Sequence, residues 1–290
     1  MARHLIYIFF FALLFLFASF PYADQQNEII ENTETGTINW SKSFLKAIGT
    51  GSPPEQIYGK ENARLLALKS ARQDALRNLL EVTKDVRIDS NTSVKKIAGE
   101  HDVIESKVQE MVRDAQVINK KYMSDGTVEV AMLMSLHGGF AQLVLPADIK
   151  QISTVKIVAS NHDASVFSST EDAAAKFDIY TGLIVDAGGI NAKPAMAVAI
   201  FDENDKEIYG SAFASREFAV QKCMSGYVKN MESARKDPRI AGNPLTVKGL
   251  RTKGPGRSNI IISNADASKI HSVFEHLAFL KECRVVIIIN

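Results

Sequence analysis

The histidines are the first residues of this chain to consider for chemistry. A catalytic zinc site needs three ligands drawn from His, Cys, Asp and Glu, plus an open position. Beyond residue 23 only His271 and His276 lie close together, while His101, His137 and His162 stand apart. Residues five positions apart on one helix point about 140° from each other, so that pair cannot share a metal ion. We interpret the pair as solvated or capping histidines.

The motif that most suggests catalysis is Ile184-Val185-Asp186-Ala187-Gly188-Gly189. It is similar to the opening of zinc-dependent cell-wall amidases, a resemblance that implies a metal-binding histidine at the glycines, completed by a glutamate and a second histidine. No histidine stands at that place here. Because glycine readily adopts positive φ, we interpret the motif as a turn after a core strand. A cell-wall (peptidoglycan) hydrolase remains the alternative function.

A second loop, Gly254-Pro255-Gly256-Arg257-Ser258, could cradle an anion, with Lys253 and Arg257 adding positive charge. A lone glycine-rich loop between strands is more typical of a hairpin turn. The sequence contains no Gly-x-Ser-x-Gly, phosphate-loop lysine or dinucleotide fingerprint. It therefore predicts no catalytic, metal-binding or cofactor-binding residues and no cofactor.

The two cysteines, Cys223 and Cys283, leave two alternatives open. In an exported protein they could form one disulfide. They could equally be two small buried apolar side chains. Spacing in the sequence does not choose between them, because a disulfide requires a short distance between the Cα atoms.

The N-terminus predicts export. Arg3 precedes an apolar run from Leu5 to Phe20, and Ala23 is followed by polar residues, as in a secretory signal peptide cleaved after residue 23. The run is shorter than the roughly 20 residues of a membrane-spanning helix, and an uncleaved anchor is the alternative. No cysteine lies near the cleavage site, so we do not expect a lipoprotein.

Composition and charge indicate a globular protein that does not bind nucleic acid. Of the 290 residues, 46% are hydrophobic and 23% are charged, which is typical of folded domains. Without residues 1–23 the chain carries 33 basic and 33 acidic residues. A nucleic acid or an acidic membrane surface as main partner usually requires a basic excess.

The periodicity predicts an α+β fold in two domains, each with helices on a mostly antiparallel sheet. We expect a disordered leader over 24–36, a first domain over 37–145 and a second domain over 146–290, with the boundary segment at 138–146. The first domain is organised around an amphipathic helix over 59–82. Its apolar residues recur every three or four positions: Leu65, Leu68, Ala71, Ala75, Leu76 and Leu79.

Further elements follow from the pattern on either side of that helix. One strand is predicted before it, ending at residues 49–51, and a short one at 86–89. Asp125-Gly126 between two alternating runs predicts a hairpin. In the second domain we expect strands near 155–158, 179–185, 195–200, 206–213 and 245–250. A polar helix or loop is expected near 171–176, and a mostly helical segment over 217–235, with a break near Gly226 as the alternative to a continuous helix. The end should be a β-α-β unit, because Ser263 to Asp266 resembles a capping box and 285–289 is an unbroken apolar strand. We expect its strands to run parallel.

The first domain resembles a family of exported proteins over roughly residues 37–136. The residues that carry the resemblance are Gly49-Thr50-Gly51, Ala63-Arg64, Ala67, Ala71, Ala75, Arg77 to Leu80, Val86 to Asp89, and Asp125 to Val130. They resemble the twenty-kilodalton outer-membrane lipoprotein (LPP-type) family and the N-terminal domain of flagellar assembly protein T. The resemblance implies a periplasmic α+β domain associated with the outer membrane or the flagellar basal body, without catalytic residues.

Two classes of function follow. The first is an exported, non-catalytic cell-envelope protein, a periplasmic binding or assembly factor for an outer-membrane or flagellar structure. Its expected partners are envelope proteins or peptidoglycan, with a peripheral outer-membrane association. The second is the peptidoglycan hydrolase. Because the amidase-like motif lacks its histidine, we favour the first.

Overall fold

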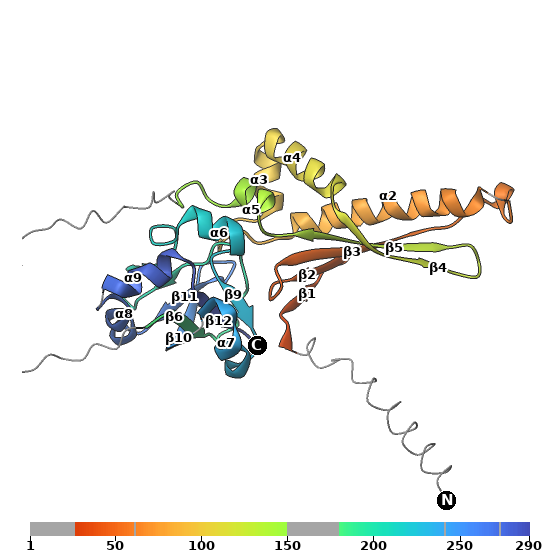
Figure 1. The fold of residues 1–290 in the computed structure, drawn as a ribbon. Helices are drawn as coiled ribbons and strands as arrows, with labels where there is room; N and C mark the ends of the chain where they lie inside the picture. The colour runs from red at the N-terminus through yellow and green to blue at the C-terminus, as the bar shows by residue number, and fades with distance from the viewer. Residues whose placement is uncertain (1–26, 61, 150–179, 241, 273) are drawn as a thin grey trace, which may run out of the picture.

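The protein combines two β-sheets with helices, which confirms the α+β class and the two-domain organisation (Figure 1). The computed structural model describes residues 27–60, 62–149, 180–240, 242–272 and 274–290. The predicted signal peptide, His162, and the strand and helix expected within 155–176 lie outside the described residues. Among the described residues, no helix combines the length and apolar character needed to cross a membrane.

The first sheet has five antiparallel strands in the order β1-β2-β3-β5-β4. They are β1 (Ile30–Asn32), β2 (Gly36–Asn39), β3 (Phe44–Gly51), β4 (Gln116–Tyr122) and β5 (Val128–Ser135). The single strand expected before the long helix is thus a hairpin of β2 and β3. The disordered leader expected over 24–36 is also wrong, since Ile30 to Asn32 pair with Thr37 to Asn39. The polar composition of that segment suggested disorder, although the segment forms the edge strand β1. The short strand expected at 86–89 is reduced to one bridge, Arg87 to Ser93.

The long helix α2 (Ala63–Lys84) follows a short 3-10 turn, Glu55–Ile57, and covers one face of β3 and β5. The face it buries is carried by alanines four residues apart, namely Ala67, Ala71 and Ala75, followed by Leu79. A side chain on Gly51 would lie 2.3 Å from the carbonyl oxygen of Ala67, so helix and strand meet backbone to backbone. Leu65, expected on the buried stripe, is 65% exposed.

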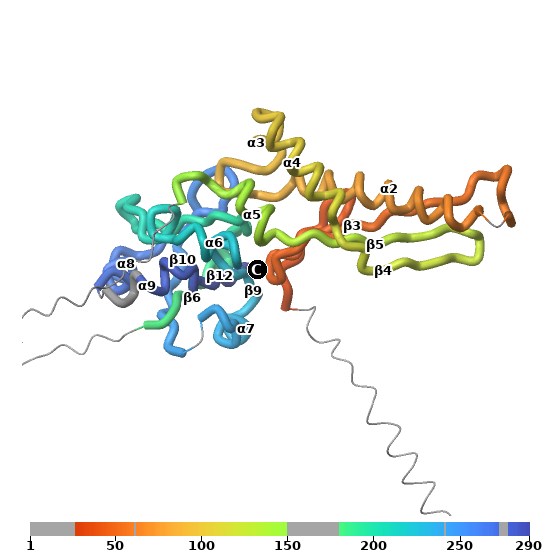
Figure 2. The backbone as a smooth tube through the Cα atoms, turned by 45° about the horizontal axis from the view of Figure 1, so that its top comes forward, coloured from red at the N-terminus to blue at the C-terminus, as the bar shows by residue number. Residues whose placement is uncertain are grey.

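Three shorter helices complete the first domain: α3 (Val94–Glu100), α4 (Asp102–Arg113) and α5 (Gly139–Val144). The predicted hairpin is present. Gly126 has φ 83°, and Asp125 accepts a hydrogen bond from the Thr127 amide at 2.9 Å. In both views α2, β3, β4 and β5 project together away from the second domain (Figures 1 and 2). We call these four elements and the turns between them the arm.

The second sheet has seven strands in the order β8-β7-β11-β10-β6-β12-β9. They are β6 (Gly182–Asp186), β7 (Ile200–Phe201), β8 (Glu207–Tyr209), β9 (Gly226–Val228), β10 (Pro244–Lys253), β11 (Asn259–Ile262) and β12 (Val285–Ile288). The helices are α6 (Arg216–Lys222), α7 (Met231–Lys236), α8 (Asn264–His271) and α9 (Phe274–Lys281), with a 3-10 turn at Pro238–Ile240. The helix expected over 217–235 is interrupted by β9.

The second sheet differs from the mostly antiparallel sheet we expected. Of its six pairings, only β7 with β8 and β10 with β11 are antiparallel, and the other four are parallel. The terminal elements do follow the order strand, helix, strand. However, β11 runs opposite to β12, with β10 and β6 between them, so they are not joined by a parallel crossover. Local periodicity predicts which segments are strands, but it does not determine their order or direction.

Two details of the C-terminal prediction are confirmed. The Ser263 hydroxyl accepts a hydrogen bond from the Asp266 amide at 3.1 Å and donates to the Asp266 carboxylate at 2.9 Å, which starts α8. All four residues of β12 are buried, as expected for a strand covered on both faces.

The segment expected to be an exposed boundary is instead part of the contact between the domains. Phe140, Ala141 and Val144 of α5 are buried. Arg216 of α6 donates to the carbonyls of Pro146 at 2.7 Å and Gln142 at 2.9 Å. One cluster of buried apolar residues extends through both domains, and a second, smaller one in the second domain contains Ile184 and Val286.

Candidate functional site

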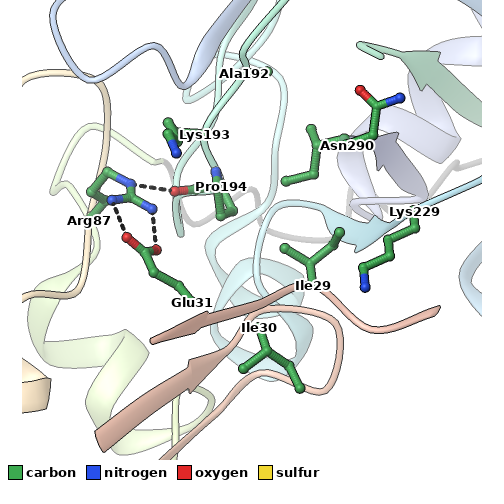
Figure 3. Close-up of a pocket in the computed structure, with 10 residues that line it drawn as sticks. Ile29, Ile30, Glu31, Arg87, Ala192, Lys193, Pro194, Lys229 and Asn290 are labelled. Carbon is green, nitrogen blue, oxygen red and sulfur yellow. Dashed lines mark hydrogen bonds and ion pairs between the residues drawn. The ribbon is translucent and has the colours of Figure 1, made fainter. Parts of the chain in front are cut away.

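A pocket of about 250 Å³ lies where the two domains meet (Figure 3). It is lined from the first domain by Ile29, Ile30, Glu31 and Arg87, and from the second by Ala192, Lys193, Pro194, Lys229, Ile289 and Asn290. We call it the junction pocket. Its walls are mainly apolar, and its charged groups come from both domains.

Arg87 and Glu31 form an ion pair that closes one side of the junction pocket (Figure 3). The guanidinium donates to both carboxylate oxygens, with Nη1 to Oε1 at 2.9 Å. Its Nε donates to the carbonyl of Pro194 in the second domain at 2.8 Å. Trp40 donates from its indole nitrogen to Glu31 at 2.9 Å, and the Arg87 guanidinium lies 5.6 Å from the Trp40 ring centroid.

The surroundings of Glu31 favour its charged form. Burial raises the pKa of Glu31, but hydrogen bonds from Arg87 and Trp40 and the positive charges of Arg87 and Lys193 lower it, and the net pKa lies below the usual 4.5. Lys193 and Lys229 also line the pocket, and their positive charges contribute to the lowered pKa values of Glu31 and Glu28, respectively. None of its ten lining residues is a Ser, Cys, His or Tyr that could act as a nucleophile.

The amidase-like motif forms a turn, as interpreted from the sequence. Asp186 ends β6 and accepts hydrogen bonds from Lys248 at 2.9 Å and from the Gly188 amide at 3.1 Å. Burial raises the pKa of Asp186, but these two partners hold it below its usual value. Gly189 has φ 81°, and its amide donates to Asn290 at 2.9 Å. Asp186 is thus held as a paired carboxylate beside a glycine turn.

His137 and His271 each contact a different backbone carbonyl. His137 contacts the carbonyl of Gln221 through Nδ1 at 2.8 Å, and His271 contacts the carbonyl of Ile208 through Nε2 at 3.0 Å. His101 is exposed between α3 and α4. His271 ends α8 whereas His276 belongs to α9, so the two do not share one helix as assumed from the sequence. Within the described ranges, no three His, Cys, Asp or Glu residues are grouped so that they could bind a metal ion.

Both cysteines are free and buried, which decides between the two alternatives in favour of apolar packing. The carbonyl oxygens of Cys223 and Cys283 lie 3.1 Å and 3.2 Å from the same guanidinium nitrogen of Arg239. Burial raises the pKa of the Cys223 thiol to about 11 and also raises that of Cys283. Neither thiol is reactive at neutral pH.

The glycine-rich loop at 254–258 contacts the first domain rather than cradling an anion. The Gly256 amide donates to the carbonyl of Ser90 at 2.7 Å, and the Ser90 hydroxyl donates to the carbonyl of Lys253 at 3.0 Å. A side chain on Gly254 would lie 2.4 Å from that hydroxyl. The Lys253 ammonium pairs with Asp205 at 2.8 Å and lies 4.2 Å from the Phe201 ring centroid.

The feature that sequence reasoning missed is an exposed apolar surface on the arm. Ten large apolar residues of the described chain are exposed, and seven of them belong to the arm: Ile48, Tyr58, Leu65, Leu66, Val117, Ile118 and Tyr122. They lie on more than one face of the arm: Ile48 points away from α2, because its neighbour Gly49 faces the helix, and Leu65 points about 160° away from the buried Ala67. We call these seven the arm residues. The sequence does indicate these residues, because α2 contains more leucines than can fit on one buried face of a helix.

A comparison with family models matches residues 182–290 to the family described as Treponema pallidum Tp0624, second domain. The match begins with β6 and covers less than half of the chain. A comparison with curated proteins finds no match. The resemblance of residues 37–136 to the LPP-type and flagellar families therefore stays a prediction.

Proposed function

We propose that this chain is an exported, non-catalytic protein of the cell envelope that acts in the periplasm as a binding or assembly factor. Its partners are other envelope proteins or peptidoglycan, in an outer-membrane or flagellar structure. The observation that carries the proposal is the concentration of the arm residues on one projecting part of the molecule.

The arm supports this proposal on energetic grounds. Burying apolar surface contributes about 25 cal/mol per Å² removed from water, so exposed leucines and tyrosines leave binding energy unused in the isolated chain. Leu65, Leu66 and Tyr122 are 65%, 42% and 47% exposed. Aromatic residues are enriched at the contacts between proteins, and Tyr58 and Tyr122 fit that pattern.

Export and location rest on the sequence. Arg3 and the apolar run from Leu5 to Phe20 predict a cleaved signal peptide. The resemblance of residues 37–136 to outer-membrane and flagellar proteins suggests the compartment and the structure served. The same resemblance, without a cysteine at the predicted cleavage site, suggests peripheral association rather than a lipid anchor.

The test immobilises three forms of the mature protein on a resin, incubates each with an envelope extract and compares the proteins that are retained. Wild type should retain a defined set of envelope proteins, and Leu65→Ser combined with Leu66→Ser should lose them. Val103→Ser is the matched control, because Val103 of α4 is 68% exposed but lies outside the arm. Thermal melting of each variant excludes misfolding as the cause.

The hydrolase alternative is tested on the same protein. We expect metal analysis to find no bound zinc and purified peptidoglycan to stay undigested. Stoichiometric zinc together with turnover of peptidoglycan would overturn the non-catalytic proposal in favour of the hydrolase.

A further inference from the structure

Strand β4 is an open edge of the first sheet. It pairs with β5 on one side, and no other described strand pairs with it on the opposite side (Figure 1). All seven of its residues, Gln116–Tyr122, are exposed. Every second backbone N–H and C=O group of such a strand faces outward, where an added strand can bind it.

Helix α2 turns one flank toward this edge. On its other flank, Asp74 accepts from the Thr50 amide at 2.9 Å and Asn78 donates to the Ile48 carbonyl at 2.8 Å, so they bind the side of β3 that faces away from β5. At 100° per residue, Arg72 points about 160° away from Asp74. Arg72 therefore lies on the flank toward β5 and β4.

Arg72 and Lys120 stand at the same level along the arm. Lys120 is opposite Val130 of β5, which is opposite Gly49 of β3. A side chain on Gly49 would touch the backbone of α2 at Ala71 and Ala75, and Arg72 belongs to that turn of the helix. Since Val130 is buried beneath α2, Lys120 is on the helix side of the sheet.

The flank is positively charged without compensation. Lys121 pairs with Glu129 at 3.7 Å. Arg72 and Lys120 are exposed, and neither forms an ion pair within the part of the chain that the structure describes. Arg64 lies over the ring of Tyr122 at 5.4 Å, which adds a further cation at the end of the strand.

We propose that β4 binds an extended, acidic segment of a partner protein, which adds to the sheet as a sixth strand. The backbone of the segment would pair with the outer edge of β4. Its acidic side chains would face Lys120 and Arg72 on the helix side of the sheet, and the apolar side chains between them would point to the opposite face. This inference rests on the proposed function, for which it names a site and the chemistry of the partner.

The charges also explain why a second copy is not the added strand. Two β4 strands side by side would bring together two copies of both Lys120 and Lys121. Lysines at an edge disfavour this kind of pairing between identical strands. An acidic segment gains from the same lysines.

The probe is a synthetic nine-residue peptide in which valine alternates with glutamate, labelled for fluorescence anisotropy and added to the mature protein. We expect saturable binding and slower amide hydrogen exchange in β4. A peptide with lysine in place of glutamate should bind at least about tenfold more weakly. A peptide with alternate backbone amides methylated should not bind, because it lacks the hydrogen-bond donors of a strand.

Charge reversal in the protein supplies the complementary test. Lys120→Glu combined with Arg72→Glu should weaken binding of the glutamate peptide about tenfold or more and allow the lysine peptide to bind. Both side chains are exposed, and unchanged melting temperatures would verify folding. Lys206→Glu, at an exposed position between β7 and β8 of the second domain, is the control and should leave both affinities unchanged.

Four results would overturn the inference: no binding of the glutamate peptide, equal binding of the methylated peptide, protection outside β4, or dimerisation of the protein through β4. A different result would assign these cations to a membrane. In that case the protein would not bind the peptide but would sediment with anionic lipid vesicles, and Lys120→Glu combined with Arg72→Glu would abolish the sedimentation. If the peptide fails while Leu65→Ser and Leu66→Ser still abolish capture of envelope proteins, the proposed function stands and only this inference fails.

Discussion

Gly49 and Ala75 lie so close together that a side-chain carbon on Gly49 would stand 2.0 Å from the backbone nitrogen of Ala75. Strand β3 and helix α2 therefore meet without any side chain between them at this point. This contact holds the arm together, because α2 packs on β3 and β5, and these two strands connect the edge strand β4 to the rest of the sheet.

Gly49→Ala should destabilise the protein strongly. The added methyl would overlap backbone atoms of α2 that cannot move without displacing the helix, at a cost of about 3 kcal/mol. Gly99→Ala is the matched control, since Gly99 lies in α3 with open space around it and alanine favours a helix. Urea denaturation of both variants checks this, and a Gly49→Ala protein as stable as wild type would show that β3 and α2 are not in close contact.

Ala75→Leu tests the same interface from the helix side. Ala75 is fully buried, so the larger side chain should overpack the contact and lower the free energy of unfolding by about 1–3 kcal/mol. Gln73→Ala, at an exposed position of the same helix, should change it by no more than about 0.5 kcal/mol. Equal stability of the two variants would mean that the alanines face solvent or a partner.

The ion pair of Glu31 and Arg87 predicts a loss of stability in acid. The pKa of Glu31 is lower in the folded protein than the usual 4.5 of the unfolded chain, so the unfolded state binds more protons between these two values. The contribution of Glu31 to the free energy of unfolding is complete above pH 4.5 and is lost as the pH falls through the pKa of Glu31 in the folded protein. Urea midpoints of wild type and Glu31→Gln, measured from pH 7 to pH 3, should therefore converge in acid. A difference between the two urea midpoints that stays constant from pH 7 to pH 3 would contradict a lowered pKa of Glu31 in the folded protein.

The two domains should unfold in one transition. Trp40, the single tryptophan, meets Tyr227 of the second domain edge to face at 6.2 Å, and the Ser41 hydroxyl donates to the Tyr227 carbonyl at 2.6 Å. Tryptophan fluorescence and far-UV circular dichroism should give the same midpoint, and residues 139–144 should resist proteolysis. Two separate midpoints, or native-state cleavage in α5, would support the independent domains expected from the sequence.

The thiols of Cys223 and Cys283 should be unreactive until the protein unfolds. Both are buried, and burial raises the pKa of Cys223 to about 11. A chromogenic disulfide reagent at pH 7.5 should label no thiol in native protein and two in denaturant. Rapid labelling of native protein would show that the cysteines are exposed, and fewer than two thiols after unfolding would indicate a disulfide.

The sequence predicted those features that depend on neighbouring residues. The Asp125-Gly126 turn, the cap at Ser263 and the alanines of α2 each have a local physical cause. Leu65 was assigned to the buried stripe because periodicity does not show which flank of a helix a sheet covers. The glycines of β3 determine which face of α2 packs on the sheet, and they are separated from the helix residues they contact by many positions in the sequence.

The long-range features required the structure. Glu31 and Arg87 are brought together by the pairing of β1 with β2, in a segment whose polar residues suggested disorder. The open edge of β4 follows from the strand order, which no local pattern encodes. Both the junction pocket and the exposure of the arm residues depend on such contacts, whereas the turn at Gly188 and Gly189 could be assigned from the sequence.

The most direct test of the proposed binding role of the arm is photo-crosslinking in intact cells that produce the full-length chain. A photoreactive phenylalanine analogue would replace Tyr122 or Leu65 on the arm, or Leu250 of β10, which is similarly exposed at 45%. We predict that both arm positions crosslink to the same envelope protein and that position 250 does not. Crosslinks at position 250 without any at positions 65 and 122 would contradict a binding role for the arm.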